Sequence, residues 1–153
     1  MKLLLDTTYF LPVIGISVKN LPKDAPTKLI HKEHQIFISD ITIFELSAKG
    51  AKYAASGIIP PERISRGIRA LIYNETINTL PIYESTILHT AFKLRNMISD
   101  FIDCLILSSA INNCDALITE DNDIQNIKEN KNLQEIITTK NPKFQIHKLT
   151  EIL

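Results

Sequence analysis

The stretch SDFIDCLILSSAINNCDALITEDNDI, residues 99–124, combines an apolar core pattern with six carboxylates. Its apolar residues predict a helix over 101–113, followed by a buried strand over 116–118. No Lys or Arg occurs between Arg95 and Lys128. Carboxylates in apolar surroundings are unfavourable unless a partner compensates their charge. A divalent cation is the natural candidate for that partner.

Apolar strand and helix patterns alternate along the rest of the chain. Short apolar runs predict strands at 2–5, 35–38, 77–82 and 144–149. Helical patterns occupy 27–34, 41–56, 62–73 and 84–97, with short helical turns within 8–16 and 122–128 and a polar region after the second turn. This alternation predicts one α/β domain over residues 1–153, with a mainly parallel sheet of about four to five strands.

The predicted helix 41–56 carries a glutamate beside its apolar face. Ser39 or Asp40 is expected to cap the helix. Glu45 stands one turn after the helix start, so we expect it to project beside the core and not away from it. The apolar face is predicted from residues at helical spacing, namely Ile41, Phe44, Ala48, Ala51 and Ala55.

Four acids from separate segments are expected to meet at one edge of the sheet. Asp6 ends the first strand, and Asp121 follows the strand at 116–118. Asp103 lies near the start of an apolar helix, and Glu45 follows the second strand. Function in open parallel sheets gathers outside the C-terminal ends of the strands. These residues are therefore the candidate metal ligands.

Each acid also has a simpler interpretation. Asp6 and Asp121 suit helix or turn caps, and Glu45 suits a position at the side of a helix with its carboxylate in solvent. Asp100 and Asp123 resemble a cap and a loop acid, although either suits a supporting role around a metal. Only the coincidence of all the acids favours a functional site.

The composition excludes several classes of protein. Lys and Arg total 17, as do Asp and Glu, so the chain lacks a global basic surface for nucleic acid. The longest apolar run, residues 9–18, is too short to span a membrane, and no signal peptide is evident. We expect Cys104 and Cys114 to be buried free thiols, typical of a cytoplasmic protein. His31 and His34 show no convincing zinc spacing.

Four segments resemble, in order, the motifs of the PIN-domain proteins, particularly the archaeal and bacterial kind to which VapC toxins belong. LLLDTTYFLPVIGI resembles the opening of that family, and SDITIFELSAKG places Glu45 where its second motif has a glutamate on a helix. DCLILSSA resembles the third motif and ITEDNDI the fourth. The resemblance covers residues 2–124 and implies a three-layer α/β/α PIN-like fold.

The resemblance implies a metal-dependent ribonuclease that uses Mg²⁺ or Mn²⁺ and leaves a 5′-phosphate and a 3′-hydroxyl. Hard oxygen ligands suit these ions, which bind phosphate oxygens directly. Asp6 and Asp103 would be the main ligands, with Glu45 and Asp121 completing the site directly or through water. Thr119, and Thr8 as a second candidate, would orient a ligand or the attacking water.

The resemblance also implies an RNA substrate, an antitoxin protein as partner and a homodimer. The function expected is therefore the toxin of a VapBC-type pair. Two alternatives stay open: a PIN nuclease of RNA maturation or decay, and a catalytically silent PIN fold that binds RNA or protein. The candidate path for the RNA backbone consists of basic residues on two helices, namely Lys49, Lys52, Arg63, Arg66 and Arg69, although a solvated face explains them equally well.

Two other enzyme classes fit less well. A haloacid-dehalogenase-like phosphatase requires a second Asp two residues after the first, where this chain has Thr8. A response-regulator receiver requires an acidic pair after its first strand and a Lys after its last, and neither is evident.

Overall fold

The computed structural model describes residues 1–153 and is built on a five-stranded sheet. The strands lie in the order β3-β2-β1-β4-β5, and all four pairings are parallel. This confirms the predicted α/β fold with a mainly parallel sheet. The strands are β1 (Lys2–Leu5), β2 (Gln35–Ser39), β3 (Ile77–Leu80), β4 (Ala116–Ile118) and β5 (Gln145–His147).

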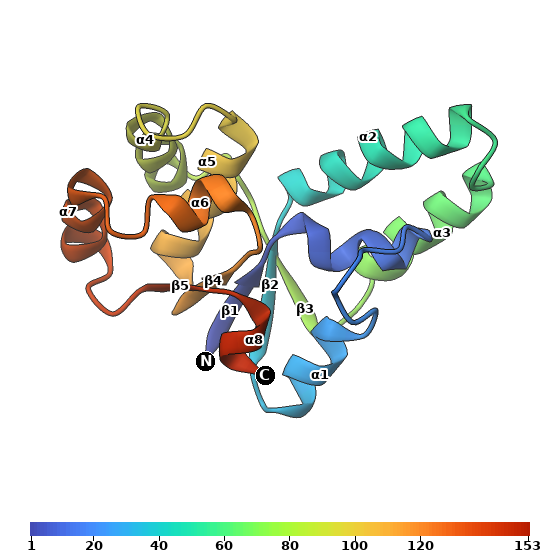
Figure 1. Ribbon diagram of the computed structural model, residues 1–153, viewed down its shortest axis with the longest axis horizontal. Helices are drawn as coiled ribbons and strands as arrows, with labels where there is room; N and C mark the ends of the chain where they lie inside the picture. The colour runs from blue at the N-terminus through green and yellow to red at the C-terminus, as the bar shows by residue number, and fades with distance from the viewer.

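Helices cover both faces of the sheet and give three layers (Figure 1). One face carries η1 (Thr7–Ile14, a 3₁₀ helix), α1 (Ala25–His31), α2 (Ile41–Ala55), α3 (Pro61–Ile72) and α8 (Leu149–Ile152). The other carries α4 (Ser85–Leu94), α5 (Phe101–Asn113), α6 (Asn122–Asn126) and α7 (Lys131–Lys140). None of these helices combines the length and apolar character that crossing a membrane requires.

Strand β1 lies at the centre of the sheet and is buried on both sides. Leu3 and Leu5 belong to the core beneath η1, α1 and α2, whereas Leu4 belongs to the core beneath α4, α5 and α7. Side chains of a strand alternate between its faces, so a strand covered on both sides has to be apolar throughout. The LLL run of β1 meets this requirement.

Two sequence-based expectations about the helices are wrong. The polar region after α6 contains α7, whose buried Leu133 and Ile137 are four residues apart on a short helix. Except for the partly buried Ile41, the predicted apolar face of α2 is turned outward: Phe44 is 61% exposed, while Thr42 and Gly50 are buried. The reason is close packing, because Ile64 of α3 lies where a Cβ on Gly50 would stand.

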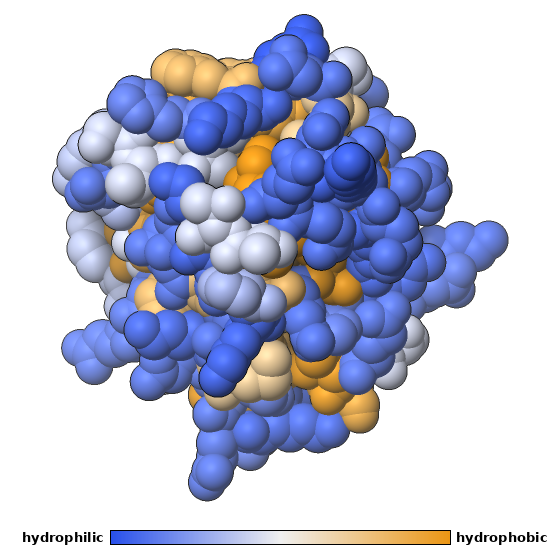
Figure 2. Space-filling model, turned by 90° about the vertical axis from the view of Figure 1, so that its left-hand side faces the viewer, coloured by the Kyte–Doolittle hydropathy of each residue, from blue (hydrophilic) through white to orange (hydrophobic).

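The space-filling view shows the outer side of α4 and α7 as mostly hydrophilic, with small apolar areas between polar side chains (Figure 2). The two chain ends lie near each other beside α8 (Figure 1). The C-terminal ends of all five strands meet at one edge because every pairing is parallel. Side chains that follow β1, β2 and β4 are therefore brought to that edge.

Candidate functional site

An open cavity of about 270 Å³ lies at the C-terminal edge of the sheet. No hydrophobic residue lines it. Five carboxylates, two hydroxyls and one ammonium face it, from Asp6, Glu45, Asp100, Asp103, Asp121, Thr7, Thr8 and Lys49. The structure thus brings together the four acids that the sequence singles out, together with Asp100, which the sequence offers as a cap or a supporting acid.

Asp6 is the most buried of these acids, with 6% of its surface exposed. It ends β1 and caps η1, and its Oδ1 accepts a hydrogen bond of 2.7 Å from the backbone N–H of Thr7. Its Oδ2 accepts a second hydrogen bond, of 2.6 Å, from the hydroxyl of Thr119. Both oxygens are thereby held in one orientation at the edge of the sheet.

The Thr119 hydroxyl connects two of the acids. It donates to Asp6 and accepts a hydrogen bond of 3.0 Å from the backbone N–H of Asp121. Asp121 in turn caps α6 by accepting from the N–H of Ile124 at 3.0 Å. Thr119 is fully buried and does not line the cavity, so its contact is with Asp6 and the backbone and not with solvent.

Glu45 reaches the cavity from the second turn of α2. Its Oε1 accepts a hydrogen bond of 2.5 Å from the hydroxyl of Thr7, which also lies 3.2 Å from the hydroxyl of Thr42. Sequence reasoning missed this role of Thr7. The signal available was its place directly after a buried strand, where the tight turn into η1 directs the side chain inward.

Two acids come from the start of α5. Asp100 caps this helix by accepting from the N–H of Ile102 at 2.9 Å, and it also lines the cavity. Asp103 lies in the first turn and is half-buried. The other loop acid considered from the sequence, Asp123, is exposed and does not line the cavity.

Burial and mutual repulsion disfavour the ionised form of two of these acids. Burial raises the pKa of Asp6 to about 6. The hydrogen bonds from Thr119 and Thr7 lower this pKa, whereas the negative charges of Glu45 and Asp121 raise it further. Burial also raises the pKa of Asp103 to about 7, and the neighbouring carboxylates add to the effect. The site therefore holds more negative charge than the protein itself compensates.

Basic side chains contribute little compensation. The three ion pairs of the structure involve none of the acids in the cavity. Lys49 lines the cavity one turn after Glu45 but is not paired with any of them. Arg63, expected to line a path for RNA, donates instead to the carbonyl oxygen of Val13 at 2.5 Å.

The donor set fits a hydrated divalent cation. No three Asp, Glu, His or Cys side chains stand close enough to form a ready-made metal cage. Mg²⁺ keeps several of its waters and typically takes only one or two protein carboxylates directly. An open, wholly polar cavity with five carboxylates suits that mode of binding, with the remaining acids held at one water's distance.

Comparison with known proteins gives two findings. A model of the PIN domain family matches residues 3–130. The structure is similar to a crystal structure of VapBC2 from Rickettsia felis bound to a DNA fragment from their promoter, with a TM-score of 0.61 and 20% sequence identity over 97% of this chain and 98% of that chain. Comparison with curated protein sequences gives no significant match.

Proposed function

The chain belongs to the PIN domain family, and from this premise we propose that it is a metal-dependent ribonuclease and the toxin of a VapBC-type pair. The observation that carries the proposal is the convergence of five carboxylates in a polar cavity without a basic partner. Such a charge arrangement is unfavourable for stability alone, and it is the arrangement that a phosphodiester-cleaving metal site requires.

We assign separate tasks to the residues of the cavity. Asp6 and Asp103 would be the main metal ligands, with Mg²⁺ or Mn²⁺ as the ion, and Glu45 and Asp121 would hold water around it. Thr119 and Thr7 would keep Asp6 and Glu45 in place, because their hydroxyls already donate to these carboxylates. When bound, the cation would supply Lewis acidity, which polarises a phosphate oxygen and strengthens water as an acid.

The raised pKa values of Asp6 and Asp103 fit this assignment. A carboxyl group whose ionised form is disfavoured gains more from a cation than one that is already compensated. Binding of the cation would therefore return both groups to the ionised state at neutral pH. Because protons compete with the cation for these groups, the proposed RNA cleavage at subsaturating metal should increase with pH through the range near 6 to 7, in which the groups titrate without metal.

A groove between α2 and α3 supports the toxin assignment over a general RNA nuclease. It has a volume of about 360 Å³ and an apolar lining that includes Ala51, Ala54, Ile64 and Ile68. The exposed Phe44 lies on the same helix α2. A helical segment of an antitoxin would bury these side chains. We propose that the antitoxin binds a homodimer of this chain. We also propose that the protein works in the cytoplasm, where the free thiols of Cys104 and Cys114 would stay reduced.

The test is cleavage of RNA by the purified protein with EDTA, Mg²⁺ or Mn²⁺. We expect metal-dependent cleavage that leaves 5′-phosphates and disappears in Asp103→Asn. Asp123→Asn removes an equal charge from an exposed position outside the cavity and should cleave normally. Loss of activity in both variants, or equal activity in Asp103→Asn and wild type, would contradict the proposed site.

The toxin role has its own readout. Induced expression of the wild type should arrest bacterial growth, and Asp103→Asn should not. Normal growth together with metal-dependent cleavage in vitro would instead favour RNA maturation or decay. Absence of both cleavage and metal uptake by calorimetry would favour the silent binding module.

A further inference from the structure

A second, larger cavity adjoins the acidic one. It has a volume of about 720 Å³ and lies between the segment 18–22, Glu120 and the chain end from Lys148 onward. Thr8 lines both cavities. The two cavities are therefore neighbours on either side of Thr8, and the second extends from there toward α8.

The second cavity carries more positive than negative side chains, namely two lysines and one glutamate. Lys19 and Lys148 line it, and neither belongs to any ion pair of the structure. Its one acid, Glu120, is already occupied: its Oε1 accepts hydrogen bonds from the hydroxyl of Tyr9 at 2.9 Å and from the N–H of Leu149 at 3.0 Å. The two ammonium groups in the wall thus have no carboxylate partner. We call this space the lysine cavity.

The sheet fixes the position of Lys148 relative to the carboxylates. Lys148 follows β5 directly, just as Asp6 follows β1 and Thr119 follows β4. The N–H of Thr119 donates to the carbonyl of His147 at 3.0 Å, so the last residue of β5 is hydrogen-bonded to the residue that holds Asp6. Because β5 is two strands from β1, Lys148 lies about 10 Å from the end of β1 along the sheet edge.

The lysine cavity also offers apolar surface. Leu21, Leu149 and Leu153 line it together with the lysines. Cationic groups beside apolar side chains suit single-stranded nucleic acid, which presents phosphates on one side and bases on the other. A neutral small molecule would not need two ammonium groups, and a basic peptide would be repelled by them.

We propose that the lysine cavity binds the nucleotides that adjoin the scissile phosphate, with Lys19 and Lys148 on the RNA backbone. The inference rests on the proposed ribonuclease function and adds the direction in which the strand leaves the site. The substrate path then runs across β4 and β5 toward α8, and Thr8 lies at the junction of the two cavities.

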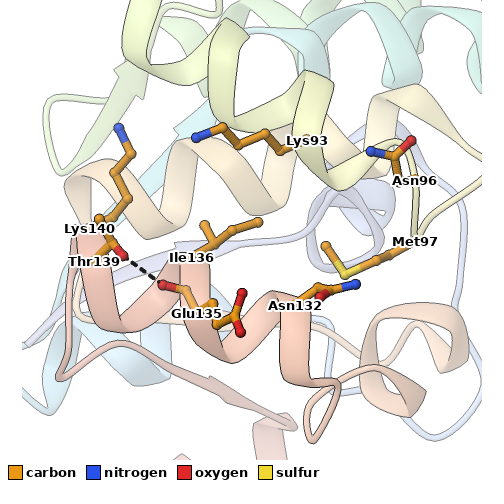
Figure 3. Close-up of a pocket in the computed structure, with 8 residues that line it drawn as sticks. All are labelled: Lys93, Asn96, Met97, Asn132, Glu135, Ile136, Thr139 and Lys140. Carbon is orange, nitrogen blue, oxygen red and sulfur yellow. Dashed lines mark hydrogen bonds between the residues drawn. The ribbon is translucent and has the colours of Figure 1, made fainter.

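The experiment measures RNA binding and cleavage for Lys19→Ala/Lys148→Ala. Binding of a labelled single-stranded RNA is followed by fluorescence anisotropy in the Asp103→Asn background at several salt concentrations. The matched control is Lys93→Ala/Lys140→Ala, because these lysines also line a shared polar groove, between α4 and α7 (Figure 3). The salt slope is the slope of the logarithm of the binding constant against the logarithm of the salt concentration. Loss of two phosphate contacts should lower the magnitude of this slope by about 1.4 and weaken binding up to about 25-fold at 0.1 M salt.

In cleavage assays of the otherwise wild-type protein, KM should rise with the same variant while kcat stays close to its original value. An unchanged Kd and salt slope in Lys19→Ala/Lys148→Ala, with cleavage intact, would overturn the lysine cavity and leave the ribonuclease function standing. Equal weakening in the Lys93→Ala/Lys140→Ala control would also overturn it, because the effect would then be one of net charge. Failure of the wild type to cleave or bind any RNA would refute both proposals together.

Discussion

Replacing Asp103 by Asn should stabilise the metal-free protein at neutral pH. The pKa of Asp103 rises from 3.8 to about 7 in the fold. That rise corresponds to about 4 kcal/mol by which the ionised group disfavours folding above pH 7. Because the cavity is open to water and other acids share the repulsion, we halve the expected gain to about 2 kcal/mol. For a chain of this length the gain is a rise in Tm of about 4–8 °C.

The sign of the pH dependence follows from the direction of the pKa change. The folded state holds its proton to higher pH than the unfolded state, so wild-type stability is lost as the pH rises from about 4 to about 7. The advantage of Asp103→Asn should therefore be near zero at pH 4 and full at pH 7.5. The assay is thermal and urea unfolding in EDTA at both pH values, with Asp123→Asn as the control for loss of one charge. A variant that is less stable than wild type at pH 7.5, or equally favoured at both pH values, would refute the reasoning.

Three further outcomes are expected. Thr119→Val should lower the free energy of unfolding by about 1–3 kcal/mol, because Asp6 loses a buried hydrogen-bond donor, and RNA cleavage should fall with it; a variant as stable and active as wild type would contradict this role. Gly67→Ala should reduce stability by about 3 kcal/mol or more in urea unfolding, because its Cβ would overlap the carbonyl oxygen of Val13, whereas Gly57→Ala has open space and should cost only about 1 kcal/mol for its positive φ. Mg²⁺ at a hundredfold excess over its Kd should stabilise the wild type by about 2.7 kcal/mol in calorimetric unfolding, and an equal gain in Asp6→Asn would show that the ion binds elsewhere.

The parts of the fold that follow from local pattern are predictable from the sequence. The helix at 101–113, the strand at 116–118 and the strand at 2–5 have the bounds expected for them. Each is apolar enough that burial on more than one side is its only stable environment. The order of the acids along the chain, combined with the rule for parallel sheets, suffices to place Asp6, Glu45, Asp103 and Asp121 near one another.

The parts that depend on packing are not predictable in the same way. Hydrophobicity assigns the wrong face of α2 to the core, because the close approach of α3 favours Gly50 over a larger side chain. The charge of Arg63 makes it a candidate for the RNA path, yet its guanidinium donates hydrogen bonds to carbonyl oxygens at the end of η1. Thr7 becomes recognisable only when the distance to Glu45 is known. Such roles depend on neighbours that are distant in the sequence.

The hydrogen bond from Thr119 to Asp6 joins residues 113 positions apart and has a consequence for synthesis of the protein. A ribosome adding about 5–20 residues per second completes Asp6 roughly 6–23 seconds before Thr119. During that interval β1 lacks its neighbour β4, and Asp103 is added only about 1–3 seconds before Thr119. The proposed site can therefore form only after Asp121 has been added. A prematurely terminated product that lacks β4 would therefore be without the proposed nuclease activity.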